Sequence, residues 1–345
     1  MALFTTSAIS NLNLTRVICE RDASILEKEK NKYTRSLVQN RSKQDACGYV
    51  HTDELSILWC SDSHGGQIDK KSKVIRDFLN SIPDKKWVEY VSQEDFYKGD
   101  MDEETGTFKS QLFRDIAANG PYKDTGATLS IVTITPTHIV CYRVGDSPIY
   151  VFRDGENILY SDHDEEWETD LKEFKQRNYF DFDIHPKCSN KNGVIDAPDV
   201  IAVSAKVMTR KPSYYVYWDC GSATNMSRGI GHNKLETYEK RVKKAILENK
   251  SIMPSVPNWT MTKTIIERVP ESKEKIIVAS DGVSAVCGEF DYPFMSSAET
   301  AVDIMEVAYD RWKQNWVFKV EGYANQYNRI PDWNRDDMAI VTWNN

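Results

Sequence analysis

The fold of this chain is decided by the stretch Leu55-Ser56-Ile57-Leu58-Trp59-Cys60-Ser61-Asp62-Ser63-His64-Gly65-Gly66. It begins with a run of aliphatic and aromatic residues, which is typical of a buried β-strand. The run ends at Asp62 and His64, and the two glycines that follow allow a tight backbone turn. The stretch therefore predicts a strand that carries an acid and a histidine to its end.

Three other segments also place an acid next to an apolar run. They are Asp281 after the run 276–280, Asp146 after 140–144, and Asp336 before 338–343. A single carboxylate at a strand end usually does no more than close a turn. Several of them, from distant parts of the sequence, indicate acids that converge on one site.

Composition limits the classes of function. Hydrophobic residues make up 40% of the 345 residues, which is enough for a sizeable core, and the net charge of -8 argues against a nucleic-acid partner. No stretch approaches the roughly 20 apolar residues of a membrane span, so we expect no membrane partner. The seven cysteines are scattered without a Cys-x-x-Cys pair, which is typical of reduced thiols. We therefore expect a cytoplasmic protein.

Periodicity divides the chain into strands and helices. Strands are predicted at 36–39, 55–60, 126–134, 138–144, 149–152, 262–269, 275–279 and 336–343. Helices are predicted at 67–82, 108–118, 235–249 and 297–315. Pro83 ends the first helix, and a capping box over 296–299 starts the last one. The strands between 126 and 152 predict a three-strand meander, whose inward residues would form half of a sandwich core.

The chain contains no internal repeat and no low-complexity linker. We therefore expect a single domain over 1–345. The long irregular excursion that begins at 161 and continues to 260 is typical of a lid or binding loop, and we expect it to form a flap beside the site.

The chemistry of the acids favours hard divalent cations. Carboxylates without a matching set of cysteines or histidines suit Mg²⁺ or Mn²⁺ better than zinc. Two such ions sharing a carboxylate can activate a water and neutralise phosphoryl oxygens, and a nearby histidine could protonate the leaving oxygen.

The residues resemble a known family. Asp62-Ser63-His64-Gly65-Gly66 is similar to the Asp-Gly-His-Gly-Gly motif of the metal-dependent PPM-type Ser/Thr protein phosphatases, the protein phosphatase 2C family. Further similar motifs follow the family's order along the chain. They lie at 41–45, 126–128, 144–147, 162–163, 226–231, 279–283 and 335–338. An ordered set of motifs is specific, although each one alone is short.

The resemblance implies a fold and an activity. The fold would be α+β, a sandwich of two antiparallel β-sheets flanked by α-helices. The activity would be single-step hydrolysis of phosphoserine and phosphothreonine in proteins, by a hydroxide that bridges two Mn²⁺ or Mg²⁺ ions. The partner would therefore be a phosphoprotein substrate.

The resemblance also implies site residues. Asp62 would bridge the two metals, with Asp281 and Asp336 completing one of them and the main-chain carbonyl of Ser63 as a further ligand. Asp45 would hold a metal-bound water. Two further roles come from the same resemblance: Asp162 would bind a third, weaker ion, and Arg41 would hold the substrate phosphate. His64 would be the general acid.

Several positions depart from the family's pattern. Ser63 replaces Gly, Gln44 replaces Glu, His232 replaces Asp, Pro148 replaces Arg and Asp337 replaces Asn. The loss of a carboxylate at position 44 removes one negative charge from the surroundings of the second metal. The main alternative to an active enzyme is therefore a catalytically weak or dead phosphatase fold that serves as a binding or scaffold protein. A metallohydrolase of other phosphoesters is a third reading.

Overall fold

The computed structural model describes the side chains of most of the two sheets and their helices. These are residues 32–39, 43–64, 73–102, 104–105, 107–119, 125–161, 228–231, 259–313 and 336–345. The backbone alone is described for β1 (Thr15–Ile18), β11 (Ile184–Pro186), β12 (Ser189–Asn190), β13 (Gly193–Val194), β14 (Asp199–Ala202), β15 (Val207–Met208), β16 (Tyr214–Tyr217), β17 (Ala223–Thr224), β21 (Asn315–Lys319) and β22 (Gln326–Arg329).

Two antiparallel sheets form the centre of the fold. The first has the order β1, β2 (Tyr33–Gln39), β23 (Met338–Asn344), β20 (Glu274–Ala279), β9 (Ile149–Arg153) and β10 (Glu156–Ser161). The second has the order β19 (Thr262–Glu267), β8 (His138–Val144), β7 (Leu129–Ile134), β4 (Ser56–Ser61) and β3 (Ala46–His51). A small sheet of β18 (Ile230–Gly231), β6 (Gly126–Ala127) and β5 (Ser63–His64) lies where β4 ends.

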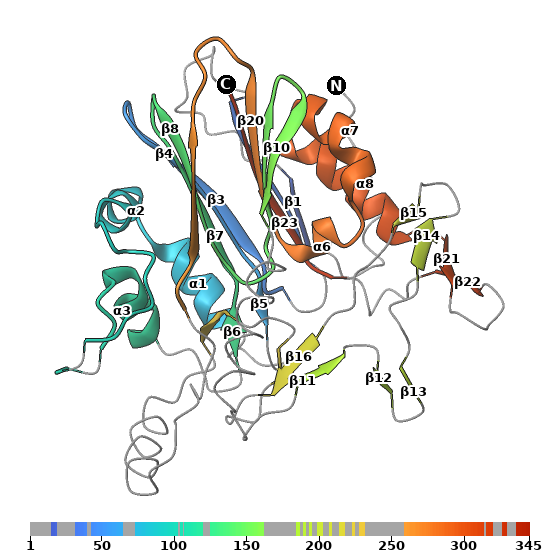
Figure 1. Ribbon diagram of the computed structural model, residues 1–345, viewed down its shortest axis with the longest axis horizontal. Helices are drawn as coiled ribbons and strands as arrows, with labels where there is room; N and C mark the ends of the chain where they lie inside the picture. The colour runs from blue at the N-terminus through green and yellow to red at the C-terminus, as the bar shows by residue number, and fades with distance from the viewer. Residues whose placement is uncertain are drawn as a thin grey trace, which may run out of the picture.

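Helices cover both outer faces of the sandwich (Figure 1). The helices α1 (Val74–Ser81), α2 (Asp84–Val91) and α3 (Gln111–Ala118) lie along the five-stranded sheet, and share one apolar core with it. On the six-stranded sheet lie α6 (Asp281–Ser284), the 3-10 turn Glu289–Asp291, α7 (Tyr292–Ser297) and α8 (Ala301–Lys313). A third apolar core fills the space between the sheets. The predicted α+β sandwich is confirmed.

The sequence patterns located most elements, but they were wrong about one strand connection and one helix start, and they missed some elements. The predicted meander over 126–152 is wrong, because β8 pairs with β7 whereas β9 pairs with β20 and β10 in the other sheet. The turn 145–148 thus carries the chain across the sandwich. Helix α8 begins at Ala301, and its capping box joins Thr300 to Asp303 through reciprocal hydrogen bonds of 2.7 and 3.3 Å, not residues 296–299. Strand β3 and helix α2 were not predicted.

Other predictions fall partly or wholly on residues that the structure does not describe. The helix expected at 67–82 is confirmed where α1 covers it, and its first six residues lie outside the described part. The helix expected at 235–249 and most of the flap at 161–260 also lie outside the described residues. Among the helices that are described, each is too short or too polar to cross a bilayer.

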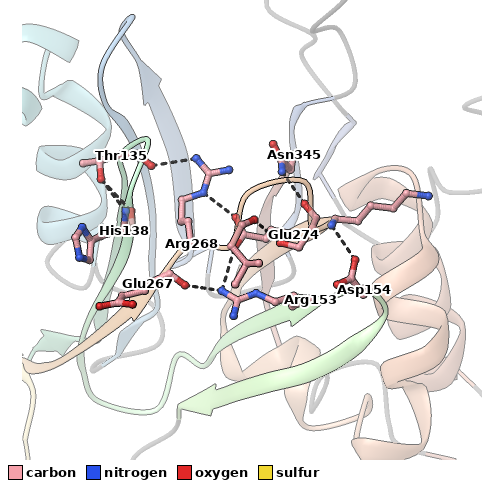
Figure 2. A network of polar contacts seen from close by, with 11 residues as sticks. Thr135, His138, Arg153, Asp154, Glu267, Arg268, Glu274 and Asn345 are labelled. Carbon is pink, nitrogen blue, oxygen red and sulfur yellow. Dashed lines mark hydrogen bonds and ion pairs between the residues drawn. The ribbon is translucent and has the colours of Figure 1, made fainter.

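A polar network joins the two sheets at one end of the sandwich (Figure 2). The side chain of Glu274, which has no exposed surface, accepts hydrogen bonds from Arg268 at 2.7 Å and Arg153 at 3.1 Å. Arg268 also donates to the main-chain carbonyl of Thr135, in the turn between β7 and β8, and Arg153 donates to that of Glu267, the last residue of β19. Because Glu274 begins β20, this network lies at the opposite end of that strand from Asp281.

Candidate metal and catalytic site

Neighbouring strands bring four of the predicted acids to one end of the sandwich. In the five-stranded sheet Ala46 of β3 is paired with Ser61 of β4, so that Asp45 and Asp62 are neighbours. In the six-stranded sheet Ala279 of β20 is paired with Ile340 of β23. Asp281 follows the first of these strands and Asp336 precedes the second. The structure therefore brings Asp45, Asp62, Asp281 and Asp336 together, as the sequence predicts.

A close backbone approach fixes the acids of the six-stranded sheet. A side chain at Gly282 would place its Cβ only 1.9 Å from the main-chain oxygen of Asp337, so that position accepts only glycine. Beside it, the main-chain N–H of Ser280 donates to Ala339 O at 2.9 Å, and the Ser280 hydroxyl accepts from Ala339 N at 2.9 Å. These bonds hold the end of β20 against the start of β23.

Thr128 makes two hydrogen bonds with the main chain of Asp62. The N–H of Asp62 donates to the Thr128 hydroxyl at 2.8 Å, and the N–H of Thr128 donates to the Asp62 carbonyl at 2.8 Å. The same hydroxyl is hydrogen-bonded to Ser147, which follows Asp146 in the turn after β8. Thr128 therefore links the central acid to that turn.

Ser63 fits the position where the family has glycine. It lies in β5, paired with Ala127, and its φ is not among the positive values found at non-glycine residues. Its backbone is therefore that of an ordinary strand, which any residue accepts. The substitution leaves the Ser63 carbonyl in place.

Mutual repulsion and burial dominate the electrostatics of the site. The pKa of Asp45 is raised well above its usual value by burial, and then by the charges of Asp337 and Asp336, against the hydrogen-bonding influence of Asp62 and Ser280. The pKa of Asp62 is also raised, by burial and by the charges of Asp45, Asp281 and Asp336. Each carboxylate thus opposes the ionisation of its neighbours.

The donor set fits a hard divalent cation. Asp45 is only 1% exposed, and neither of its carboxyl oxygens makes a hydrogen bond of good geometry within the described residues. Oxygen atoms of this kind are the ligands that Mg²⁺ and Mn²⁺ prefer. In the described part of the chain no three His, Cys, Asp or Glu side chains stand ready to hold a metal, so the carboxylates would have to reorient on binding.

His64 lies on β5, two residues beyond Asp62, and is partly exposed. Burial lowers its pKa to about 4, and the charge of Asp146 acts in the opposite direction. In the metal-free protein its surroundings therefore disfavour the imidazolium form more than water does for a free histidine, whose pKa is near 6.5. The influence of Asp146 on His64 was not predicted, because a sequence does not show that the two turns are neighbours.

Two of the predicted site residues, Arg41 and Asp162, lie outside the described residues, as does His232. The phosphate-binding role of Arg41 and the third-metal role of Asp162 therefore stay predictions.

The repulsion within the site predicts that Asp62→Asn stabilises the metal-free protein. Because the pKa values of Asp45 and Asp62 are raised on folding, the folded chain binds more protons than the unfolded chain. The protonated forms of these two acids favour the folded protein. This stabilisation is fully present below the unfolded pKa of about 3.9 and is lost as the pH rises through the raised pKa values of the folded protein. The variant should therefore melt roughly 2–8 °C higher than wild type at pH 7, and the difference should shrink at about pH 5.

The measurement is thermal unfolding in EDTA at both pH values. His64, whose lowered pKa acts with the opposite sign as the pH falls from about 6.5 towards 4, is present in both proteins and cancels in the difference. Asp310→Asn, at an exposed carboxylate of α8, is the control and should change little. A lower melting temperature for Asp62→Asn at pH 7 would contradict the account.

Solved structures with a related fold were found, at low identity. A C. elegans sex-determining protein is 13% identical with a TM-score of 0.48, and the match covers 90% of this chain and 64% of that one. Serine-threonine phosphatase 2C from Toxoplasma gondii is 10% identical, with a TM-score of 0.46 and coverage of 96% and 99%. The S. agalactiae serine/threonine phosphatase is 14% identical, with a TM-score of 0.43 and coverage of 95% and 96%.

No curated protein is similar in sequence. The assignment to a family therefore depends on the comparison with family sequence patterns. In that comparison the family described as Protein phosphatase 2C matches residues 34–314, which is most of the chain and includes the segments that carry Asp45, Asp62 and Asp281. The chain belongs to the protein phosphatase 2C family.

Proposed function

We propose that this protein is a metal-dependent phosphatase that hydrolyses phosphoserine and phosphothreonine in protein substrates. The observation that carries the proposal is the convergence of Asp45, Asp62, Asp281 and Asp336 from four segments of a chain that belongs to the protein phosphatase 2C family. Acids whose pKa values are raised by burial and by neighbouring charges, as those of Asp45 and Asp62 are, are typical of functional sites.

The chain's own residues would hold two Mn²⁺ or Mg²⁺ ions. Asp62 would be shared between them, Asp281 and Asp336 would complete one, and the Ser63 carbonyl would contribute to the site. Asp45 would orient water beside the second ion. When bound, the ions would neutralise phosphoryl oxygens and activate water for in-line attack.

The substrate phosphate and a third ion depend on residues outside the described part. Arg41 would hold the equatorial phosphoryl oxygens, and Asp162 would hold a third, weaker ion. Both assignments come from the resemblance of the segments around them to the family's motifs.

His64 would donate a proton to the leaving oxygen. A serine or threonine alkoxide is a poor leaving group, so its departure needs that proton. Burial alone opposes the imidazolium form, whereas the negative charge of Asp146 favours it. A bound phosphate would add a further negative charge that raises the pKa of His64, whereas the positive charge of the metal ions would act in the opposite direction.

The proposal also includes the domain organisation, the partner and the location of the protein. A single domain over 1–345 would carry a flap at 161–260 that influences the choice of substrate, and the partner would be a phosphoprotein. Cys47, Cys60, Cys141 and Cys287 are free thiols, which supports a cytoplasmic location.

Metal-dependent turnover is the test of this function. With Mn²⁺ or Mg²⁺ the purified protein should release phosphate from a phosphothreonine peptide, and excess EDTA should stop the release. A phosphotyrosine peptide of the same sequence should react more slowly. The measurement is initial rates of phosphate release for both peptides.

Asp281→Asn is the control, because it removes one acid and should abolish turnover. A folded wild-type protein that binds Mn²⁺ but releases no phosphate would contradict the proposed enzymatic function and support the scaffold alternative. A preference for phosphotyrosine, or for small phosphoesters over both peptides, would contradict the substrate class.

His64→Gln should lose activity selectively. Without a proton donor, turnover of the phosphothreonine peptide should fall by about 10²- to 10⁴-fold. Hydrolysis of p-nitrophenyl phosphate should fall much less, since p-nitrophenolate leaves without protonation. Rates for the two substrates are compared under saturating Mn²⁺.

The affinity for Mn²⁺, measured by calorimetry, should stay close to that of wild type. Equal losses on the two substrates, or a loss of Mn²⁺ binding, would assign His64 a structural or ligand role instead.

A further inference from the structure

Two departures from the family's pattern lie in contact with each other. Gln44 stands where the family has Glu, and Asp337 stands where it has Asn. The two positions are 293 residues apart in sequence, yet the main-chain N–H of Gln44 donates to Asp337 Oδ2 at 2.7 Å in a buried hydrogen bond. The carboxylate missing from one position is therefore present at a position that touches it.

The carboxylate of Asp337 belongs to the surroundings of the candidate metal acids. Asp337 is 1% exposed, and its main-chain N–H donates to Asp336 Oδ1 at 3.0 Å. Its main-chain oxygen lies against Gly282, next to Asp281. Among the neighbouring charges that raise the pKa of Asp45, that of Asp337 has the largest effect. Asp337 thus lies next to an acid from each of the two sheets.

The negative charge of Asp337 is more than its hydrogen bond with Gln44 requires. A neutral Asn at position 337 could accept the same hydrogen bond from Gln44 through its amide oxygen, without adding to the repulsion on Asp45. The negative charge is therefore not needed for this hydrogen bond.

We propose that Asp337 supplies the negative charge that Gln44 lacks, and is a further acid of the second metal's surroundings. The inference rests on the proposed function, and it removes the main reason to expect a weakened second site. The affinity of a protein for a divalent cation depends on the number of ligand charges. Moving one carboxylate from position 44 to position 337 keeps that number unchanged.

The test compares wild type with Asp337→Asn, Gln44→Glu and the double variant Gln44→Glu/Asp337→Asn. The readouts are the Mn²⁺ dissociation constants from calorimetry and the Mn²⁺-induced rise in melting temperature, both without substrate. Asp337→Asn should keep the hydrogen bond and fold normally, but should weaken Mn²⁺ binding at the weaker site by about tenfold or more. The double variant, which restores the family's residues, should recover most of the wild-type affinity.

Asp291→Asn is the matched control. Asp291 is also a buried carboxylate, but within the described part of the chain it accepts hydrogen bonds from Arg311 and from the main-chain N–H of Gly288, and neither is a site acid. This variant should lower the melting temperature and leave Mn²⁺ binding unchanged.

The outcomes separate the inference from the proposed function. If Asp337→Asn binds Mn²⁺ as tightly as wild type, the inference is overturned while the metal-dependent function stands. If Asp337→Asn binds Mn²⁺ more weakly and the double variant does not recover the wild-type affinity, the proposal that Asp337 replaces the charge missing at Gln44 is overturned. If wild type itself does not bind Mn²⁺, the proposed function fails together with the inference.

Discussion

Electrostatic repulsion between closely placed carboxylates is the constraint on which the site depends. Asp45 and Asp62 come from one sheet and Asp281 and Asp336 from the other; Asp45 is buried, Asp62 and Asp281 are partly buried and Asp336 is exposed. Burial, together with the neighbouring charges, raises the pKa values of Asp45 and Asp62. Such an arrangement costs folding free energy, so strong local interactions must hold it. The two hydrogen bonds between Thr128 and Asp62 and the two between Ser280 and Ala339 provide them. The apolar core between the sheets supplies the remaining stability.

The acids at the two ends of strand β20 have opposite kinds of surroundings. At its start, Glu274 is enclosed by two arginines that neutralise it and bind the sheets together (Figure 2). Beyond its other end, carboxylates lie close to further carboxylates, and neither carboxyl oxygen of Asp45 makes a hydrogen bond of good geometry in the described part of the chain. The first arrangement is that of a structural ion pair. The second offers oxygen atoms of the kind that Mg²⁺ and Mn²⁺ prefer, which supports the proposed metal site, although the carboxylates would have to reorient to hold an ion.

The sequence predicted the acids better than it predicted the path between them. Asp62, Asp281 and Asp336 follow or precede strong apolar runs, so their places at strand ends could be inferred from pattern alone. Strand β3 was missed because it contains Gly48, and glycine is a poor strand former. In the structure the Trp59 ring lies over Gly48 and fills the space that a side chain there would need. Helix α2 was missed because Pro83, which ends the preceding pattern, also caps the next helix. The crossing between the sheets at 145–148 depends on which strand β9 pairs with, and no local pattern encodes that choice.

Contacts between distant residues were out of reach of sequence patterns in the same way. The charge of Asp146 beside His64, and the hydrogen bond between Gln44 and Asp337, become visible only when the sheets are assembled. The proposed compensation between the substitutions at positions 44 and 337 rests on such a contact.

We propose that Asp45, Asp62, Asp281 and Asp336 surround one metal site. A crystal grown with Mn²⁺ and measured at the manganese absorption edge would locate the ions by anomalous scattering, without assumptions about activity. Two anomalous peaks are expected, with Asp62 within coordinating distance of both and with Asp281 and Asp336 at one of them. Peaks elsewhere on the protein, or none beside Asp62 at saturating Mn²⁺, would show that these acids do not form the metal site.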